Sequence, residues 1–305
     1  MTTPRFRTEF DPRHGEAVTV APGLQRIVAN NPSPFTFHGT NTYILGEGRS
    51  VAVIDPGPAL DEHLAAILRA LDGRAVSHIL VTHTHVDHSP LAAALKREVG
   101  AKTYGQGPHR PARELHVGEV NALDASGDTD FRPDVPLRDN DVVEGEGWRL
   151  RAVFTPGHTA NHMAFAREGT DDLLSGDHVM AWATSIVAPP DGSMADYMAS
   201  LERIAREPQT TYWPGHGGRL ENADGFVRAL RAHRRMRETA VLEQVRMGRE
   251  TIPDMVAVIY ATTDSRLHGA AGLSVLAHLE DLCARGLVTT DGPPSLDGRY
   301  RIVGG

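Results

Sequence analysis

The sequence predicts an α/β domain followed by a smaller α+β domain. Two observations lead to this architecture. Strand-like runs closed by Gly or Pro alternate with segments of helical spacing up to about residue 222, whereas the rest of the chain reads as three helices and a hairpin. A chain of 305 residues is long for one domain and comfortable for two, one of them large enough to bury a real core.

Bulk composition restricts the class of protein and its partners. The net charge of −8 argues against a chain that coats nucleic acid or anionic membrane non-specifically, although it allows a local basic patch. The one cysteine, Cys283, excludes an intramolecular disulfide and a multi-cysteine metal site. The N-terminal residues show no signal-peptide core, and no window approaches the ~20 apolar residues of a membrane span. We therefore predict a cytoplasmic protein with no membrane partner.

The first strands and helices follow from periodicity and turn residues. Strand-like runs closed by Gly or Pro cover residues 17–29, 41–46 and 50–57. Residues 61–71 have helical spacing, with acidic residues in the first turn, where they complement the helix dipole. A β-branched run at 77–82 leads into a polar loop, and Pro90 then opens a helix that continues to Gly100. The loop lies at the carboxyl end of a strand, where ligand sites of α/β sheets are commonly found.

The middle of the chain changes in character and then returns to strands. Residues 121–147 are acidic, rich in Gly and Pro and poor in periodic apolar residues, which favours a solvated insertion or series of turns over an ion-binding segment. A helix is predicted at about 194–206. Further strands, each followed by turn residues, are predicted at 148–158, 162–167, 172–178 and 210–218.

After Asn222 the pattern becomes mainly helical. A long amphipathic helix is predicted first, then two shorter helices and a hairpin, at residues 224–248, 252–261, 270–286 and 287–303. Three helices and a hairpin in this order make the pattern of a winged helix. We therefore predict two domains, 1–222 and 223–305, of which the second is winged-helix-like.

Histidines and an aspartate crowd into one bend directly after the strand predicted at 77–82. The stretch "THTHVDHSP" holds His83, His85, Asp87 and His88. Two histidines two residues apart in a turn can both point at one ion, and the adjacent Asp-His pair can reach a second ion beside it. Neutral imidazoles and a carboxylate suit a borderline cation such as Zn²⁺, held at ~2.0–2.2 Å by N and O ligands. The bend therefore predicts a metal site.

Three later strand ends supply the ligands that such a site would still lack. "TPGH" ends at His158 and "WPGH" ends at His216, and the Gly in each lets the backbone turn tightly so that the imidazole projects over the sheet edge. Between them, "SGDH" places Asp177 after another apolar run. Five histidines and two aspartates are too many ligands for one tetrahedral ion, and they suit two ions bridged by one carboxylate.

In order and spacing these residues resemble the signature of the metallo-β-lactamase fold hydrolases, over residues 17–220. The resemblance implies an αβ/βα four-layer sandwich with a dinuclear metal site on one edge. The ligand sets that it implies are His83, His85 and His158 for the first metal, and Asp87, His88 and His216 for the second, with Asp177 bridging. Asp87 and Asp177 are the carboxylates that we predict to be catalytic. Asp55 in "IDPG" resembles the family's aspartate that orients a ligand histidine.

A closer resemblance is to the lactamase-beta-2-like branch of this superfamily. The matching stretches are "NNPSPFTFHGTNTYILG", "TPGHTANHM", "GDHVM" and "APPDGSMADYMASLERI", followed by the winged-helix pattern. Several members of that branch are described as endoribonucleases, and others are uncharacterised hydrolases. The motifs are specific for the fold, whereas one scaffold can host many substrates.

The chemistry that the resemblance implies comes from the ions. We predict two Zn²⁺ per chain, with Mn or Fe also suited to the second site. A hydroxide shared by two cations is available near neutral pH because coordination lowers the pKa of water from roughly 15.7 to ~7. It would attack an ester, thioester or phosphodiester, with Asp177 orienting it. True β-lactamases of the superfamily lack the bridging aspartate and are periplasmic, which argues against antibiotic hydrolysis.

Three more specific functions stay open. A single-strand endoribonuclease fits the lactamase-beta-2 resemblance. A glyoxalase II-like thioesterase shares all seven ligands, although its C-terminal helices carry basic residues for glutathione. A winged-helix DNA-binding metal sensor is the non-enzymatic alternative, but it predicts a basic recognition helix and an incomplete ligand set. The expected substrate is thus a small-molecule ester or thioester, or single-stranded RNA.

The charge pattern of the C-terminal domain argues against duplex DNA as a partner. Residues 226–305 hold eleven Arg and no Lys against nine acidic residues. The helix that would enter a major groove, about 272–285, carries Glu280 and Asp281 against a single Arg285, which is the wrong sign for groove reading. We therefore predict a packing role for this domain, or a role in a homodimer.

Residues of the loops near the ligands have two interpretations each. His178 is a candidate proton donor or a structural histidine, and His162 is structural or lines the pocket. Trp182, Ser185 and Tyr197 in "AWATSIVAPPDGSMADY" are candidates for substrate contact or for loop packing.

Overall fold

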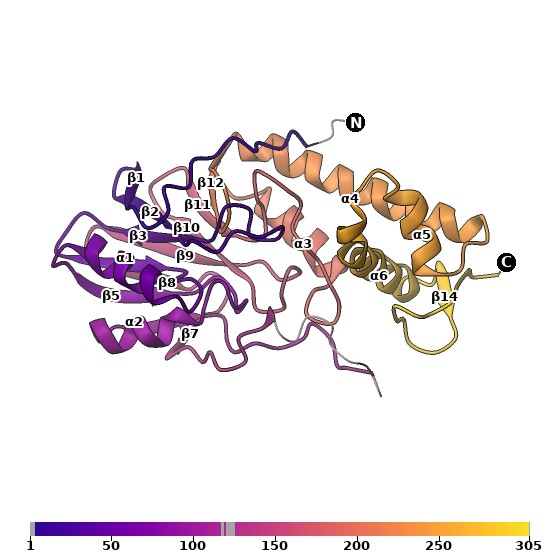
Figure 1. The fold of residues 1–305 in the computed structure, drawn as a ribbon, viewed down its shortest axis with the longest axis horizontal. Coiled ribbons are helices and arrows are strands. Elements are labelled where there is room, and N and C mark those ends of the chain that lie inside the picture. The colour runs from indigo at the N-terminus through magenta and orange to yellow at the C-terminus, as the bar shows by residue number, and fades with distance from the viewer. Residues whose placement is uncertain (1–3, 117–118, 120–125, 305) are drawn as a thin grey trace.

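The computed structural model describes residues 4–116, 119 and 126–304, and its N-terminal part contains two sheets (Figure 1). The seven strands of the first sheet lie in chain order: β1 (Val18–Ala21), β2 (Leu24–Val28), β3 (Asn41–Leu45), β4 (Ser50–Ile54), β5 (Ala75–Leu80), β6 (Lys102–Gly105) and β7 (Val135–Pro136). Strands β1 to β4 are antiparallel, and β4 to β7 are parallel. Parallel neighbours need crossover connections, and helices supply two of them.

The second sheet has six strands in the spatial order β13-β12-β11-β10-β9-β8. Its strands are β8 (Val142–Gly145), β9 (Trp148–Phe154), β10 (Met163–Arg167), β11 (Asp172–Gly176), β12 (Thr211–Pro214) and β13 (Leu220–Glu221). Only β11 and β12 run parallel, and the helix α3 (Met194–Ile204) connects them. Their carboxyl ends therefore meet at one edge, as the ends of β4 and β5 do in the first sheet.

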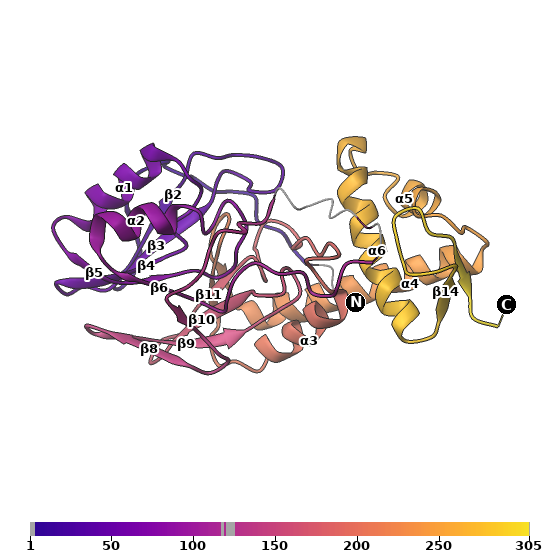
Figure 2. The same cartoon turned by 90° about the horizontal axis from the view of Figure 1, so that it is seen from below.

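Helices cover the outer faces of both sheets, which gives four layers. Helices α1 (Asp61–Leu71) and α2 (Leu91–Val99) lie on one side, and α3 with the start of α4 (Ala223–Arg246) lies on the other (Figure 2). Three separate clusters of buried side chains fill the spaces between the four layers. In β3, Tyr43 and Leu45 enter the cluster between the sheets and Ile44 the cluster under α1, because successive side chains of a strand alternate. This arrangement confirms the predicted αβ/βα sandwich.

The C-terminal elements form a smaller unit with its own core. They are the distal half of α4, α5 (Ile252–Ile259), a 3₁₀ turn at Ser265–Leu267, α6 (His268–Ala284), β14 (Val288–Thr290) and β15 (Tyr300–Ile302). In the figures these elements gather at one end of the molecule (Figures 1 and 2). The three helices and the antiparallel β14–β15 pair match the predicted winged-helix pattern.

Contacts across the proposed division at residue 222 are extensive. Val227 and Leu230 of α4 and Ala277 of α6 belong to the same buried cluster as α3 and the second sheet. Arg113, from the loop after β6, lies 2.6 Å from a carboxylate oxygen of Glu280 on α6. The helix that would enter a major groove in a DNA-binding winged helix thus packs against the first domain, in line with the packing role predicted for it. We keep 1–222 and 223–305 as a proposed division of the chain.

The prediction that the acidic segment 121–147 is a solvated insertion or series of turns is partly wrong. Residues 121–125 lie outside the described part of the chain, but β7 and β8 occupy later portions of the segment, and Leu137 and Val143 are buried. Strands of two and four residues at sheet edges are too short to show a periodic apolar pattern. Strand β6, at Lys102–Gly105, was likewise not predicted. Within the described residues, no helix is long and apolar enough to cross a membrane.

The packing between the sheets leads to a stability prediction. Phe165 on β10 is fully buried between the two sheets, so Phe165→Ala removes most of a ring and leaves a cavity. We expect the free energy of unfolding to fall by about 3–5 kcal/mol, measured by urea titration. Val142→Ala on β8 is the control, because that side chain is 39% exposed and its loss should cost less than ~0.5 kcal/mol. An equal loss in the two variants would contradict this assignment of the core.

Candidate metal centre

The seven side chains predicted as ligands come from four strand ends at one edge of the sandwich. His83, His85, Asp87 and His88 lie in the turn between β5 and α2, and the others follow β9, β11 and β12. Two inter-sheet contacts hold this edge together, because the Asn41 amide of β3 donates to the carbonyls of Pro214 and Gly217, each at 2.9 Å. The fold therefore brings all seven together, from positions 83 to 216 of the chain.

Three overlapping groups of these side chains could each hold an ion, and two of the groups have no residue in common. In the first, His85 Nδ1 lies 3.1 Å from His83 Nε2 and 3.0 Å from His158 Nε2. In the second, Asp87 Oδ2 lies 3.2 Å from His216 Nε2 and 3.3 Å from His88 Nε2. The membership of both groups agrees with the two ligand sets implied by the resemblance.

Asp177 lies between the two groups. Its Oδ2 is 3.2 Å from His216 Nε2 and 3.7 Å from His158 Nε2, and its Oδ1 is 3.6 Å from His88 Nε2. The Oδ1 atom is buried and accepts no hydrogen bond from any described residue. A buried carboxylate oxygen without a donor is costly, and a cation at this position would satisfy it. The donor set therefore fits metal ions.

The outer nitrogen of most of these rings is bound to a fixed acceptor. His158 Nδ1 lies 2.6 Å from the carbonyl of Ile186, and His216 Nδ1 lies 3.1 Å from that of Gly39. Because a carbonyl can only accept, each Nδ1 carries the proton and each Nε2 directs its lone pair toward the centre when the ring is neutral. This is the tautomer that a metal ligand needs.

Asp55 orients two of the other three rings, those of His83 and His88, through one carboxylate. His88 Nδ1 donates to Asp55 Oδ2 at 3.0 Å, and the Thr82 hydroxyl donates to the same oxygen at 2.7 Å. The Thr82 oxygen is then free to accept from His83 Nδ1 at 3.0 Å. The Thr82 backbone N–H donates to Asp55 Oδ1 at 2.7 Å, which fixes the carboxylate itself. Asp55 thus orients His88 directly and His83 through Thr82.

Burial and neighbouring charges give the two groups different protonation. Burial, together with neighbouring histidines, holds the pKa of His83 well below its usual value and lowers the pKa of His85 to about 3. Burial opposes ionisation of Asp87, yet His88 and His216 outweigh it and hold the pKa of this carboxyl well below its usual range. The first group is therefore three neutral imidazoles, since burial also lowers the pKa of His158. Burial opposes protonation of His88 and His216, yet the carboxylates of Asp87 and Asp177 outweigh it, holding the pKa of His88 well above its usual value and raising that of His216 to about 10. Neutral imidazole and ionised carboxylate are the states that bind metal, so these two rings would release protons when an ion binds.

The structure shows why a Gly precedes the histidine in both "PGH" stretches. Gly157 has φ +132°, and a Cβ there would lie 2.3 Å from the backbone Cα of Tyr197. Gly215 is needed for space, because a Cβ there would lie 2.3 Å from Asp177 Oδ1 and 2.6 Å from His88 Cε1. The tight turn predicted from the sequence accounts for Gly157, whereas at Gly215 the reason is the close approach of the site itself.

Other polar residues contact the predicted ligands or their backbone, although they lie outside the ligand motifs of the sequence. Thr84, between two ligands, accepts from the Asn161 amide at 2.8 Å, and its hydroxyl lies 3.0 Å from His109 Nδ1. The Asn161 amide also donates to the carbonyl of Gly107. Thr40 donates to Asp87 Oδ2 at 3.1 Å. These contacts tie the histidine bend to the loops after β6 and β9 and to the start of β3. Only the polar composition of "TANH" and "GTNT" hinted at them.

The loop residues with two interpretations are mostly structural. His162 is fully buried, and its Nε2 accepts from the Asp177 backbone N–H at 3.1 Å, so it supports a ligand segment. His178 is fully buried with its ring 4.8 Å from that of Tyr197, and burial lowers its pKa to about 3, which leaves it a poor proton donor. Ser185 and Tyr197 are buried and donate to backbone carbonyls. Trp182 is partly exposed and stacks on Phe37, at 4.7 Å between ring centroids.

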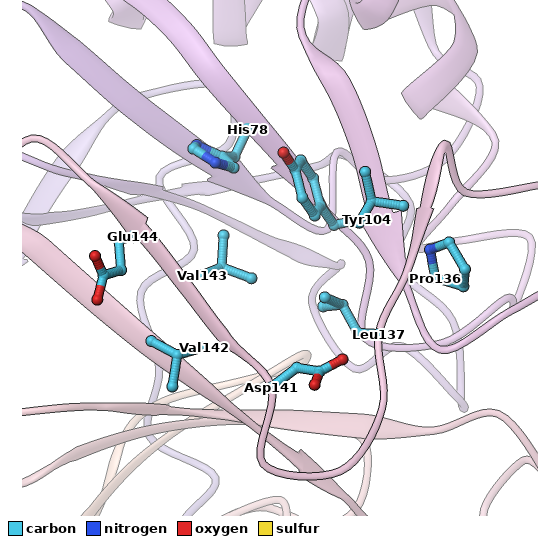
Figure 3. A pocket seen from close by; sticks show the side chains of 9 residues that line it. His78, Tyr104, Pro136, Leu137, Asp141, Val142, Val143 and Glu144 are labelled. Atoms are coloured by element: carbon cyan, nitrogen blue, oxygen red, sulfur yellow. The ribbon is translucent and has the colours of Figure 1, made fainter.

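A separate groove of about 320 Å³ opens at another place, between the first sheet and β8. His78 and Tyr104 line it from β5 and β6, opposite Val142 and Glu144 (Figure 3). None of the seven predicted ligands lines this groove. The predicted ligands therefore lie elsewhere, at the carboxyl ends of the strands.

Comparison with known proteins agrees with this geometry. The model of the metallo-beta-lactamase superfamily matches residues 35–216, and that of the beta-lactamase associated winged helix domain matches residues 251–294. The chain belongs to the metallo-β-lactamase superfamily. It is a hydrolase of this superfamily with a C-terminal winged-helix domain, as the sequence resemblance implied. The assignment of individual ligands to individual ions remains a proposal.

Two named relatives are similar over most of the chain. The beta-lactamase-like protein 2 homolog of Drosophila melanogaster is 34% identical over 267 residues, which are 84% of this chain and 86% of the relative. The atrochrysone carboxyl ACP thioesterase of Claviceps purpurea is 29% identical over 265 residues, which are 84% of this chain and 78% of that protein.

Solved structures share the fold along nearly the whole chain. A metallo-beta-lactamase family protein from Thermus thermophilus has a TM-score of 0.74 and 25% identity, covering 93% of this chain and all of that one (100%). A beta-lactamase domain protein from Burkholderia ambifaria has a TM-score of 0.76 and 24% identity, covering 96% and 95%. The coverage includes both domains of the superfamily hydrolase.

The crowding at Gly215 predicts a loss of metal binding from one methyl group. In Gly215→Ala, the added Cβ must displace Asp177 or His88, so we expect metal affinity at least about 10-fold weaker in a chelator competition. Gly218→Ala, three residues on, is the matched control, because the nearest atom to its Cβ is 3.6 Å away. Wild-type affinity in Gly215→Ala, or an equal loss in both variants, would contradict the packing described for the site.

Proposed function

We propose that the protein is a cytoplasmic hydrolase that binds two zinc ions and cleaves thioesters. The observation that carries the proposal is the convergence of five histidines and two aspartates at one edge, with the outer nitrogens of four rings hydrogen-bonded. Nitrogen and carboxylate donors without a thiolate suit Zn²⁺, and Mn or Fe fits the second site. The single cysteine, Cys283, fits a reducing compartment.

Asp177 and Asp87 have different roles in the proposed reaction. Bound in the two groups, zinc ions would lower the pKa of a water and polarise the bond to be cleaved. The free Oδ1 of Asp177 can accept a hydrogen bond from that water and orient it. Asp87 is held by Thr40 and by His216, so its carboxylate cannot swing toward solvent. We assign Asp177 and Asp87 as the catalytic carboxylates.

Access to the site is from the side of the histidine bend. His85 and Asp87 are partly exposed and Val86 between them is 42% exposed, whereas His83, His88 and the later ligands are buried. Phe37, in the loop that precedes Thr40, stacks on Trp182, and both rings lie next to Gly217, the neighbour of His216. An exposed apolar rim beside ionised and metal-binding groups suits a substrate with an apolar acyl part.

A thioester combines these requirements, and a named relative supports this substrate class. The Claviceps purpurea relative is an atrochrysone carboxyl ACP thioesterase, and its similarity extends over most of both chains. Duplex DNA is not supported as a partner, since α6 packs against α3 and its Glu280 is paired with Arg113. Single-stranded RNA remains an outcome of the substrate test below.

The dinuclear site predicts a metal content. Protein purified without chelators should contain two zinc ions per chain, as measured by elemental mass spectrometry. Removing them should lower the melting temperature, and adding zinc at about 1,000 times its Kd should restore roughly 4 kcal/mol of stability. His14→Ala, at an exposed position, is the control that should change neither value. Well under one ion per chain would overturn the proposed site.

The substrate class is tested by a panel of hydrolysis assays. Zinc-loaded protein is assayed on an acyl-pantetheine thioester, S-lactoylglutathione, a lactone, single-stranded RNA and a phosphodiester dye. We expect the acyl thioester to have the highest kcat/KM. His85→Ala and Asp87→Ala should each lower it by more than about 100-fold, since loss of a ligand's supporting partner alone costs 10–100-fold. Activity that survives both substitutions would exclude the dinuclear mechanism, and a preference for RNA would exclude the thioester.

A further inference from the structure

Arg234 is a buried cation that enters the first domain from the C-terminal side of the proposed boundary. It lies on α4 and is only 4% exposed. Its guanidinium carbon sits 5.2 Å from the ring centroid of Tyr197 on α3. Among the described residues no carboxylate lies within ion-pair distance of it, and its Nε has no hydrogen-bond partner. Burying an unpaired guanidinium is costly, so some other contact has to favour its position.

The contact that Arg234 makes is to the backbone of a ligand-bearing loop. One terminal nitrogen of its guanidinium donates to the carbonyl of Ser185. A hydrogen bond from a charged donor is stronger than one between neutral groups, and burial strengthens it further. Arg234 therefore holds the peptide unit that joins Ser185 to Ile186.

This peptide unit is connected to two of the proposed ligands. The Ser185 hydroxyl contacts the carbonyls of Asp177 and His178, and so ties the peptide back to the bridging carboxylate. On the other side, the carbonyl of Ile186 accepts from His158 Nδ1 at 2.6 Å. A shift at Ser185 would therefore move the backbone of Asp177 and break the hydrogen bond that fixes the orientation and tautomer of His158.

Tyr197 supports the same loop beneath the guanidinium. Its hydroxyl donates to the carbonyl of His178 at 3.0 Å, and its ring carries the cation–π contact with Arg234. Arg234 and Tyr197 thus hold the loop from Asp177 to Ile186 near both of its ends, at the carbonyls of Ser185 and His178.

We propose that Arg234 is a positioning residue for the metal centre, through which the long helix of the C-terminal part fixes Asp177 and His158. The inference rests on the proposed metal-binding function for its effect on affinity, but the effect on the loop is independent of any ion. Helix α4, whose distal half packs in the winged-helix part, then contributes to catalysis by holding the loop, without contacting substrate.

The test compares Arg234→Met with Arg235→Met. Methionine keeps an apolar stem and removes the charge and every donor. Arg235 is the matched control, because it is the next residue on the same helix and is exposed. Two readouts are taken: zinc affinity by chelator competition, and amide hydrogen exchange of residues 177–187 in chelator-treated protein, with residues 41–54 as the internal reference for global folding.

In Arg234→Met we expect zinc affinity to fall about 10–100-fold. Exchange of residues 177–187 should become about 10-fold faster or more, since a charged hydrogen bond is lost, while residues 41–54 keep their protection. Arg235→Met should leave both readouts unchanged. Arg234→Lys restores the charge without the planar fork and should give intermediate values.

Wild-type exchange and wild-type affinity in a folded Arg234→Met variant would overturn the proposal. If that variant does not fold, Arg234→Lys decides, and wild-type values for both of its readouts would overturn the proposal equally. If the unaltered protein binds no zinc, the proposed function fails, and the exchange of residues 177–187 alone then confirms or overturns the role of Arg234.

Discussion

The candidate metal centre depends on one buried carboxylate that fixes the direction of two imidazoles. Histidine nitrogens lie 3.0–3.4 Å apart here, and a fixed hydrogen-bond partner on the outer nitrogen decides which nitrogen a ring presents to the centre. Asp55 supplies that partner for His88 directly and for His83 through Thr82. Because Asp55 follows β4 and the histidines follow β5, the parallel pairing of these strands is what makes the arrangement possible.

The second sheet contributes the remaining predicted ligands, and two of them again follow a pair of parallel strands. The parallel pair β11–β12 has a register shift between Leu174 and Gly176, directly before Asp177. The backbone N–H of Gly215 donates to the carbonyl of Gly176, so the segments that carry Asp177 and His216 are held side by side. The backbone N–H of Asn41 then donates to the carbonyl of Gly215 at 2.7 Å, which links this pair to the first sheet. The two sheets are thus joined at the edge where the ligands meet.

The fold and the seven convergent residues could be predicted from the sequence because each residue stands next to a local sequence feature, such as a Pro-Gly pair or an apolar run. His158 and His216 follow Pro-Gly, and the histidine bend follows an apolar run. The groups that orient the rings have no such feature, since the carbonyls of Ile186 and Gly39 belong to any residue type. Strands β7 and β8 were missed because edge strands this short have no measurable period. Arg234 looked like one of several arginines on an amphipathic helix, and only tertiary packing distinguishes it from Arg235.

Trp182, which stacks on Phe37, places a fluorescent side chain close to the predicted ligand His216. Two of the protein's three tryptophans, Trp148 and Trp213, are buried in the cluster between the sheets, at 4% and 3% exposure. Trp182 is partly exposed, and its indole lies 3.0 Å from the position of a Cβ on Gly217, next to His216. The solvent-sensitive part of the intrinsic fluorescence is therefore expected to arise beside the candidate metal centre. An occupant of the apolar rim would change the emission of this one indole without any label attached to the chain.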